Sequence, residues 1–276
     1  MVKMLSRGIR AGWMLLGIVA ASVAAEVPKM ICYSVQPNTY LSERAAEIAK
    51  IYDGFYFTIG SWETGPEQFL GMNGRPPRDA QWLNLAGKNL AALRKAGVTE
   101  NFLTVYFGQD DAWPSPTTLL SAEYSRKMAD CFAAVAKTAR DLQFRGLCID
   151  VEYPYPRYNI DHPVYTYEGY TVEDILKAAK QQGRMTMAAV LDQFPQAAII
   201  MLPGEIRVRP ICREYQLGLL EVMAERNAPG GMHLGTEFTY SMSDPITDLL
   251  TARAQDVSMA TRSEEHTSEL QSPNTI

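Results

Sequence analysis

The sequence predicts an α/β protein with the fold of a (β/α)8 TIM barrel, truncated after about six βα units. Strand-like and helix-like segments alternate from Met30 onward, which is the pattern of a parallel sheet covered by helices. No two-residue turn joins adjacent strands, so the pattern contains no hairpin signal. The alternative is an open, doubly wound sheet. That fold usually carries a glycine-rich phosphate loop after its first strand, whereas the corresponding segment here, SVQPNTYLSE, has no glycine.

Six short runs rich in apolar, β-branched and aromatic residues are the predicted strands. They cover residues 30–35, 54–62, 101–108, 145–152, 197–202 and 232–240. A complete barrel typically needs about 250 residues or more, and these units already use most of the chain. The last two units are therefore expected to be missing.

The segments between the strands have helical spacing and recognisable ends. Gly97 follows one helix as a C-terminal glycine does, and Ser121 caps the next. The helix that begins at Thr171 opens with a capping-box pattern, TVED, and a break is expected within it at Gly183. The predicted helices cover residues 41–52, 80–96, 121–143, 171–194 and 213–226, and a last one starts at Asp244-Pro245.

The N-terminus has the order of a secretory signal peptide. Its first ten residues carry three basic side chains, residues 11–23 are apolar but short for a bilayer span, and small residues lead up to Ala25. We expect residues 1–25 to be removed and the mature protein to be secreted or periplasmic, with no stable membrane span. An uncleaved N-terminal anchor is the alternative, but it leaves the small residues without a purpose.

The last residues differ in character from the rest of the chain. RSEEHTSELQS, residues 262–272, resembles the in-frame translation of a sequencing adapter. We expect residues 262–276 to be an artefactual tail, so that residues 26–261 form an incomplete barrel domain. The acid/base cluster that the tail contains is set aside as a site candidate (Glu264, Glu265, His266).

The composition of the chain argues against some classes of partner and cofactor. The formal net charge is −5, and no Lys/Arg run stands out beyond the N-terminus, which argues against a nucleic-acid partner. No His-x-x-His or Cys-x-x-Cys spacing occurs, so no metal site is expected, and no cofactor is predicted. The four cysteines are expected to be mostly buried free thiols.

The most informative stretch is RGLCIDVEYPYPRY, residues 145–158. Because side chains alternate across a strand, its apolar residues share the face beneath the helices (Leu147, Ile149, Val151). Asp150 and Glu152 share the opposite, inner face with Gly146 and Cys148, about 6.5–7 Å apart along the strand. They lie at its carboxyl end, which is the catalytic face of barrel enzymes.

Two neighbouring carboxyl groups suit the hydrolysis of a glycosidic bond. One of them must be protonated to donate to the leaving oxygen, and a second negative charge nearby raises its pKa. Glu152, nearer the mouth, is the candidate general acid, and Asp150 would orient or stabilise. The alternative is a structural ion pair, for instance with Arg145 or Arg157.

RGLCIDVE also resembles the fourth-strand motif of chitinase-like family 18 glycosidases, an Asp-rich run that ends in Asp-x-Glu. The resemblance implies that Glu152 protonates the glycosidic oxygen and that Asp150 positions the N-acetyl group of the substrate, which acts as an internal nucleophile. Arg145 and Cys148 stand where that family has two further acids. The resemblance covers this strand and the general barrel order, and a wider set of barrel glycosidases also carries an acid/base Glu at the end of strand four.

Other candidates lie after the remaining strands. Glu237 would share the inner face of the sixth strand with His233 and act as a second catalytic carboxylate, or else form a salt bridge at the mouth. Tyr240 is an alternative contact if the register differs by one residue, because chitinase-like barrels use a Tyr on this strand. Further substrate contacts are predicted in the loops after strands two, three and four (Trp62, Glu63, Gln109, Tyr153, Tyr155).

Two functions remain open from the sequence. The first is an exported enzyme that cleaves glycosidic bonds in a polysaccharide. The second is a carbohydrate-binding or scaffold barrel in which Asp150 and Glu152 only hydrogen-bond sugar hydroxyls. The two differ in whether Glu152 takes part in turnover.

Overall fold

The computed structural model describes residues 29–58, 80–106, 120–150, 170–202 and 210–235. These contain one six-stranded sheet in the order β1-β2-β3-β4-β5-β6, and every neighbouring pair runs parallel. The strands are β1 (Ile31–Val35), β2 (Gly54–Thr58), β3 (Glu100–Tyr106), β4 (Gly146–Asp150), β5 (Ala198–Leu202) and β6 (Met232–Leu234). A doubly wound sheet reverses its strand order at a switch point. The sequential order therefore confirms the predicted barrel class.

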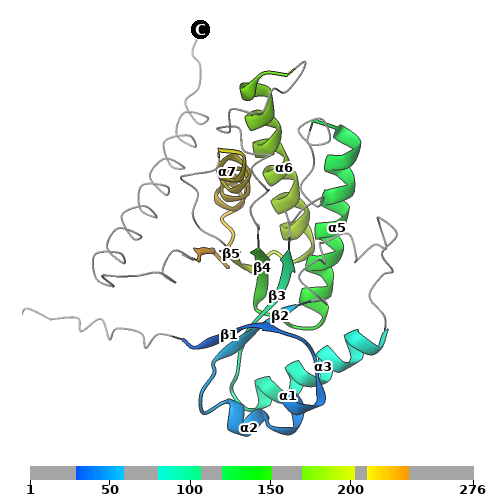
Figure 1. Cartoon of the computed structure of the whole chain (residues 1–276), viewed down its shortest axis with the longest axis vertical. Coiled ribbons are helices and arrows are strands. Elements are labelled where there is room, and N and C mark those ends of the chain that lie inside the picture. The colour runs from blue at the N-terminus through cyan, green and yellow to red at the C-terminus, as the bar shows by residue number, and fades with distance from the viewer. Residues whose placement is uncertain (1–28, 59–79, 107–119, 151–169, 203–209, 236–276) are drawn as a thin grey trace, which may run out of the picture.

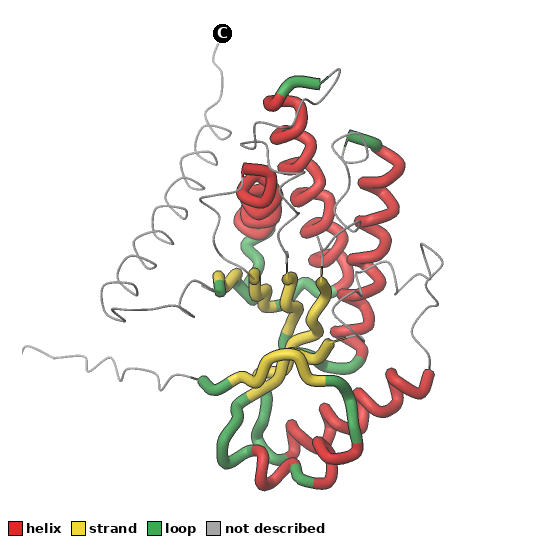
Figure 2. Tube along the Cα trace, in the orientation of Figure 1, coloured by secondary structure: helices red, strands yellow, loops and turns green. Residues whose placement is uncertain are grey.

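Helices connect the strands and lie along the outside of the sheet (Figures 1 and 2). They are α1 (Thr39–Glu43), α2 (Ala45–Ile48), α3 (Ala80–Lys95), α5 (Ala122–Asp141), α6 (Val172–Gln193) and α7 (Pro210–Glu225). The predicted end signals are confirmed. Ser121 caps α5 through its side chain, Thr171 and Asp174 form the capping box of α6, and Gly97 has a φ of +95° after α3.

The two faces of the sheet carry different side chains. The outer face packs against the helices and builds the main core, for example with Phe57 of β2, Leu103 of β3 and Ile149 of β4. The inner face carries a smaller apolar cluster made by the strands themselves (Phe102, Cys148, Ala198, Ile200). Such an inner layer of strand side chains is what a barrel interior contains.

Residues 41–52 were predicted as one helix, which is wrong. The structure has two short helices, α1 and α2, separated at Arg44, where φ is −112° and ψ is 18°. The backbone N–H of Arg44 donates to the carbonyl of Tyr40 at 2.9 Å, and the carbonyl of Arg44 accepts from the N–H groups of Glu47 and Ile48, so one set of helical bonds ends and a new one begins at this residue. The helical spacing in the sequence holds for both pieces, because Leu41, Ala45 and Ile48 are all buried.

The break expected at Gly183 does not occur, and α6 is continuous through this residue. The glycine serves the contact between α6 and α7. A Cβ at Gly183 would lie 2.0 Å from the carbonyl oxygen of Tyr215, and a Cβ at Gly218 would lie 2.1 Å from that of Lys180. Each glycine therefore gives the other helix room to approach with its backbone.

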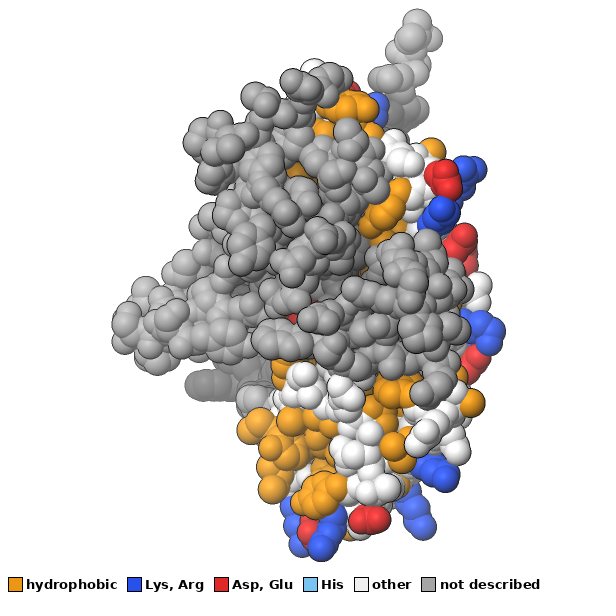
Figure 3. All heavy atoms as spheres, turned by 45° about the vertical axis from the view of Figure 1, so that its right-hand side comes forward, with side chains coloured by type: hydrophobic (Ala, Val, Ile, Leu, Met, Phe, Trp, Pro, Cys, Tyr) orange, Lys and Arg blue, Asp and Glu red, His pale blue; other side chains and the backbone are white. Residues whose placement is uncertain are grey.

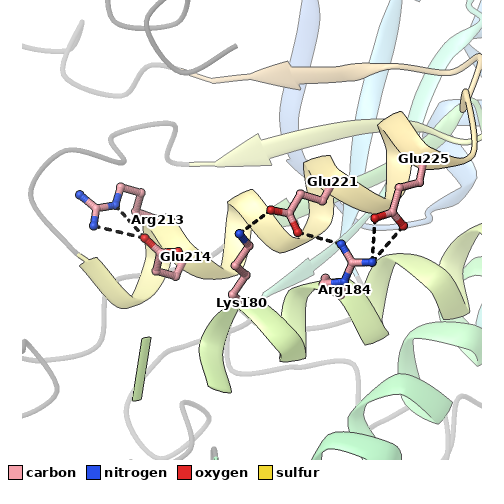
Figure 4. A network of polar contacts seen from close by, with 6 residues as sticks. All are labelled: Lys180, Arg184, Arg213, Glu214, Glu221 and Glu225. Carbon is pink, nitrogen blue, oxygen red and sulfur yellow. Dashed lines mark hydrogen bonds and ion pairs between the residues drawn. The ribbon is translucent and has the colours of Figure 1, made fainter. Parts of the chain in front are cut away.

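An ion-pair network joins the same two helices (Figure 4). The carboxylate of Glu221 in α7, whose side chain is buried, contacts Lys180 Nζ and accepts from Arg184 Nη1 at 2.7 Å. Arg184 also reaches Glu225, one turn further along α7, at 2.8 Å. The close backbone approach at the glycines brings these charges together.

The outward face of α5 carries charges of both signs. Lys127 pairs with Glu123, and Lys137 pairs with Asp141, each four residues apart. Figure 3 shows basic and acidic side chains interspersed along the right-hand edge of the described surface. Among the described helices, none has the length and apolar character that crossing a lipid bilayer requires.

Candidate functional site

Asp150 is the last described residue of β4, at the carboxyl end of the strand. The predicted alternation is confirmed there, since Leu147 and Ile149 belong to the outer core and Cys148 to the inner cluster. Asp150 is two residues after Cys148 on the same strand and therefore faces inward as well. It is fully buried, with an exposed fraction of 0%. A carboxylate is costly to bury, so its hydrogen-bond partners decide what it can do.

The hydroxyl of Tyr33, on β1, donates a hydrogen bond to Oδ2 of Asp150. These two strands are three positions apart in the sheet order. In a flat sheet they would be about 14 Å apart, since neighbouring strands are spaced by about 4.8 Å. The bond is possible because the sheet curls and its inner faces look at each other. Tyr33 and Asp150 thus form a bridge across the inside of the partial barrel.

A β-bulge in β1 follows Tyr33 and sets the direction of Val35. Cys32 is paired with Phe55, whereas the next pair is Val35 with Phe57, so β1 carries one residue more than β2 between the two pairs. Ser34, within this interval, has a φ of +59°. Bulges of this kind re-aim side chains and often lie beside functional sites. Here the bulge combines an inward Tyr33 with a Val35 that packs against the outer core.

An aromatic wall lies beside the bridge. The ring of Tyr33 meets that of Tyr56 edge to face at 5.8 Å, and Tyr56 meets Phe102 in the same way at 5.7 Å. Burial raises the pKa of Tyr56 well above its usual range. Tyr56 therefore stays protonated and uncharged at physiological pH.

The alternative of an ion pair between Asp150 and Arg145 is wrong. Arg145 precedes β4, about 16 Å of extended chain from Asp150. Its Nε lies 3.1 Å from Oε2 of Glu100, the first residue of β3, and Lys29 contacts the same carboxylate. These charges lie at the amino ends of the strands, which in barrels is the end associated with stability.

The sequence analysis missed Tyr33, although a signal for it exists. Ile31 packs against the inner cluster and Cys32 against the outer core. Alternation alone therefore places Tyr33 on the inner face of β1. The fact that its hydroxyl reaches β4 could not be foreseen, because it depends on the curvature of the sheet.

Asp150 is the one predicted site residue that the described ranges contain. The others lie outside the described residues (Trp62, Glu63, Gln109, Glu152, Tyr153, Tyr155, Glu237, Tyr240), as do Arg157, residues 1–25 and residues 262–276. His233 is described, and its pairing with Ile200 places it on the inner face of β6, where it is exposed. None of the four cysteines forms a disulfide, and three of them are buried. Within the described ranges, no three His, Cys, Asp or Glu side chains are grouped to hold a metal ion.

No protein-family model matches the chain, and no curated protein matches it. Solved structures with a partly similar chain path include an old yellow enzyme homologue from Zymomonas mobilis, 13% identical over 73% of this chain and 67% of that one, with a TM-score of 0.42. A glycoside hydrolase family 5 enzyme from Prevotella bryantii B14 is 14% identical over 60% of this chain and 46% of its own, with a TM-score of 0.41. A family 18 chitinase from Cycas revoluta is 13% identical over 63% and 45%, with a TM-score of 0.34. The chain thus spans less than half the length of these two glycoside hydrolases, and likenesses this weak assign neither a family nor an activity.

Proposed function

We propose that this protein is an exported glycoside hydrolase-like enzyme that cleaves glycosidic bonds in a polysaccharide. Glu152 is the proposed general acid, and Asp150 is its helper. The observation that carries the proposal is the placement of Asp150, a fully buried carboxylate on the inner face at the carboxyl end of β4. Active sites of barrel enzymes are built at this end of the strands.

The hydrogen bond from Tyr33 supports a helper role for Asp150. A carboxylate that accepts a bond from a fixed hydroxyl is held in one orientation, so its second oxygen keeps a defined direction. An acid whose main task were proton donation to a substrate would need a more accessible position. The buried Asp150 fits the positioning role, and the residue nearer the mouth fits the donor role.

The proposed role of Glu152 follows from its spacing. Two residues after Asp150, it would share the inner face if the alternation of β4 continues, about 6.5–7 Å away. The charge of Asp150 at that distance would raise the pKa of the Glu152 carboxyl and keep its proton available for the leaving oxygen. Glu237 and Tyr240 on the sixth strand, and the loop residues Trp62, Gln109 and Tyr153, are proposed as further contacts.

The decisive experiment compares turnover and affinity in the full chain. Wild-type protein is incubated with cellulose, xylan, mannan and chitin, and new reducing ends are counted; tetrasaccharides of the same four sugars are titrated by calorimetry. Glu152→Gln should lose about 10²–10⁴-fold in turnover, the usual contribution of a general acid, while affinity for the tetrasaccharide is kept. Glu173→Gln, an exposed change at the start of α6, is the matched control and should leave both unchanged.

Three results would contradict the proposal in different ways. Turnover that survives in Glu152→Gln removes this residue as the acid. Binding without turnover in the wild type supports a carbohydrate-binding or scaffold barrel instead. Neither binding nor turnover with any of the four sugars removes the carbohydrate partner altogether.

Export is proposed from the signal-peptide pattern, and it has its own test. The protein is expressed in a bacterium with an intact secretion pathway, and the N-terminus of the material outside the cytoplasm is sequenced. A mature chain that starts near Glu26 supports removal of residues 1–25. Full-length protein that stays in the membrane fraction would support the uncleaved anchor.

A further inference from the structure

A row of short polar side chains crosses the inner face just below Asp150. Thr58 of β2 is paired with Thr104 of β3, and Thr104 is paired with Cys148 of β4. Cys148 belongs to the inner cluster. Thr58 is two residues after Tyr56, and Thr104 is two residues after Phe102, so both threonines face inward as those aromatic residues do. The row therefore lies between a layer of aromatic rings and the carboxylate. Barrel interiors are usually filled by bulky branched residues, so three short side chains in one row are unusual.

The two hydroxyls of this row are buried but have no hydrogen-bond partner among the residues that the structure describes. Thr58 is 1% exposed and Thr104 is 0% exposed. A buried hydroxyl that stays unpaired destabilises a fold, and most buried polar groups in proteins find a partner. A valine has the same shape without this cost. Two such hydroxyls side by side are therefore best explained by a polar group that they bind.

Thr186 in α6 provides the contrast within the same chain. It is also 0% exposed, but its hydroxyl accepts from Gln182 Nε2 at 3.5 Å. For this buried threonine, which lies within the packed helices, the fold thus supplies a hydrogen-bond donor. The inner row lacks such partners in the described part of the chain, at the place where the proposed substrate site begins.

We propose that Thr58 and Thr104 form the floor of the substrate site and bind a hydroxyl group of the carbohydrate that Asp150 contacts. This inference rests on the proposed function. Thr104 of β3 pairs with Cys148 of β4, and Cys148 lies two residues before Asp150 along β4. The Cα of Thr104 is therefore about 8 Å from that of Asp150. The substituents of one sugar ring span such a distance. The floor therefore recognises a hydroxyl on the same ring that the carboxylate holds.

The test uses the full chain, the isosteric variants Thr58→Val and Thr104→Val, and Thr104→Ser, which keeps the hydroxyl. Calorimetry measures the affinity for the tetrasaccharides of cellulose, xylan, mannan and chitin, and thermal unfolding measures stability. Each valine variant should bind about three- to ten-fold more weakly, the worth of one hydrogen bond, with an unchanged or higher melting temperature. Thr104→Ser should retain affinity. Thr186→Val is the matched control: it should melt at a lower temperature and bind as the wild type does.

Each contrary outcome is decisive. Valine variants that bind as tightly as the wild type would contradict the proposed role of Thr58 and Thr104 in substrate binding. They would not contradict the proposed function. Valine variants that unfold or melt at a lower temperature would contradict the role of the two threonines as well, because the hydroxyls then serve the fold. A wild type that binds none of the four tetrasaccharides overturns the proposed function, and the floor with it.

Discussion

The side chain of Asn89 in α3 pairs with the backbone of Asn38, at the start of α1. Its Oδ1 accepts from the Asn38 N–H at 3.0 Å, and its Nδ2 donates to the Asn38 carbonyl at 2.8 Å. Asn89 is fully buried, and Asn38 in turn caps α1 by accepting from Leu41 N. This amide pair fixes the segment that follows β1, four residues after Ser34 in the bulge.

Replacing Asn89 by leucine should therefore be costly. It removes two hydrogen bonds and leaves the peptide groups of Asn38 without this partner, which we expect to lower the free energy of unfolding by about 2–4 kcal/mol. Urea denaturation measures the loss, and hydrogen exchange should show faster exchange at the Asn38 amide. Asn84→Leu, an exposed change in the same helix, is the control. Equal stability of the two variants would mean that the amide pair does not hold this segment.

Tyr33→Phe keeps the ring of this residue and removes only the hydroxyl. Because the buried Asp150 loses a hydrogen-bond donor, we expect the free energy of unfolding of the variant to be about 1–3 kcal/mol lower than that of the wild type. A double-mutant cycle with Asp150→Asn separates the pair from other effects. The coupling should be a substantial part of the loss. A coupling indistinguishable from zero would show that the bridge between β1 and β4 contributes nothing to stability.

Gly218→Ala tests the contact between α6 and α7. The new methyl group would meet the carbonyl oxygen of Lys180 at 2.1 Å, and backbone cannot yield as a side chain does. The helices must separate, so we expect a loss of about 1–3 kcal/mol or more. Gly87→Ala in α3 is the matched control, because its methyl would meet Leu142 at an ordinary 3.6 Å. That variant should gain about 0.5–1 kcal/mol through helix propensity. Losses of equal size at both positions would refute the steric explanation.

The capping box of α6 predicts a pH dependence. Hydrogen bonds from the Thr171 side chain and backbone lower the pKa of Asp174 below its ordinary value of 3.8. The Asp174 carboxyl therefore binds a proton more readily in the unfolded chain than in the folded one. Its contribution to stability is fully present when the pH is above the ordinary pKa, and it is lost as the pH falls through the lowered pKa of the folded state. Asp174→Asn should flatten the decline in stability between neutral pH and about pH 3, measured by urea unfolding. Glu173→Gln, in the same turn, leaves the capping pair in place, so an identical flattening there would count against the explanation.

The fold was largely predictable because its signals are local and repeated. Each signal concerns only residues that are close together in the sequence. Examples are the alternation of apolar residues in the strands, the Ser121 cap and the glycine after α3. The prediction of a helix break at Gly183 was wrong because the role of this residue depends on a contact that is distant in the sequence. Its low helix propensity suggested a break, but the residue is required by the backbone of α7, which is far away in the sequence. The bulge at Ser34 left no glycine in the sequence to mark it.

The candidate site was predictable to a smaller extent. The inward direction of Asp150 followed from the period of a strand. Its partner Tyr33 did not, because 117 residues separate the two and only the curvature of the sheet brings them together. The threonines of the inner row were likewise not recognisable, since an unpaired hydroxyl is a property of the packed structure and not of the residue type.

The extra residue in β1 has a practical consequence for protein engineering. Val35 packs against the helices and Tyr33 points into the interior, although their spacing in an unbroken strand would put both on one side. Shortening this strand by one residue would send either the valine or the phenol to the wrong side. Libraries that vary this region should therefore hold its length constant and randomise only the amino-acid types.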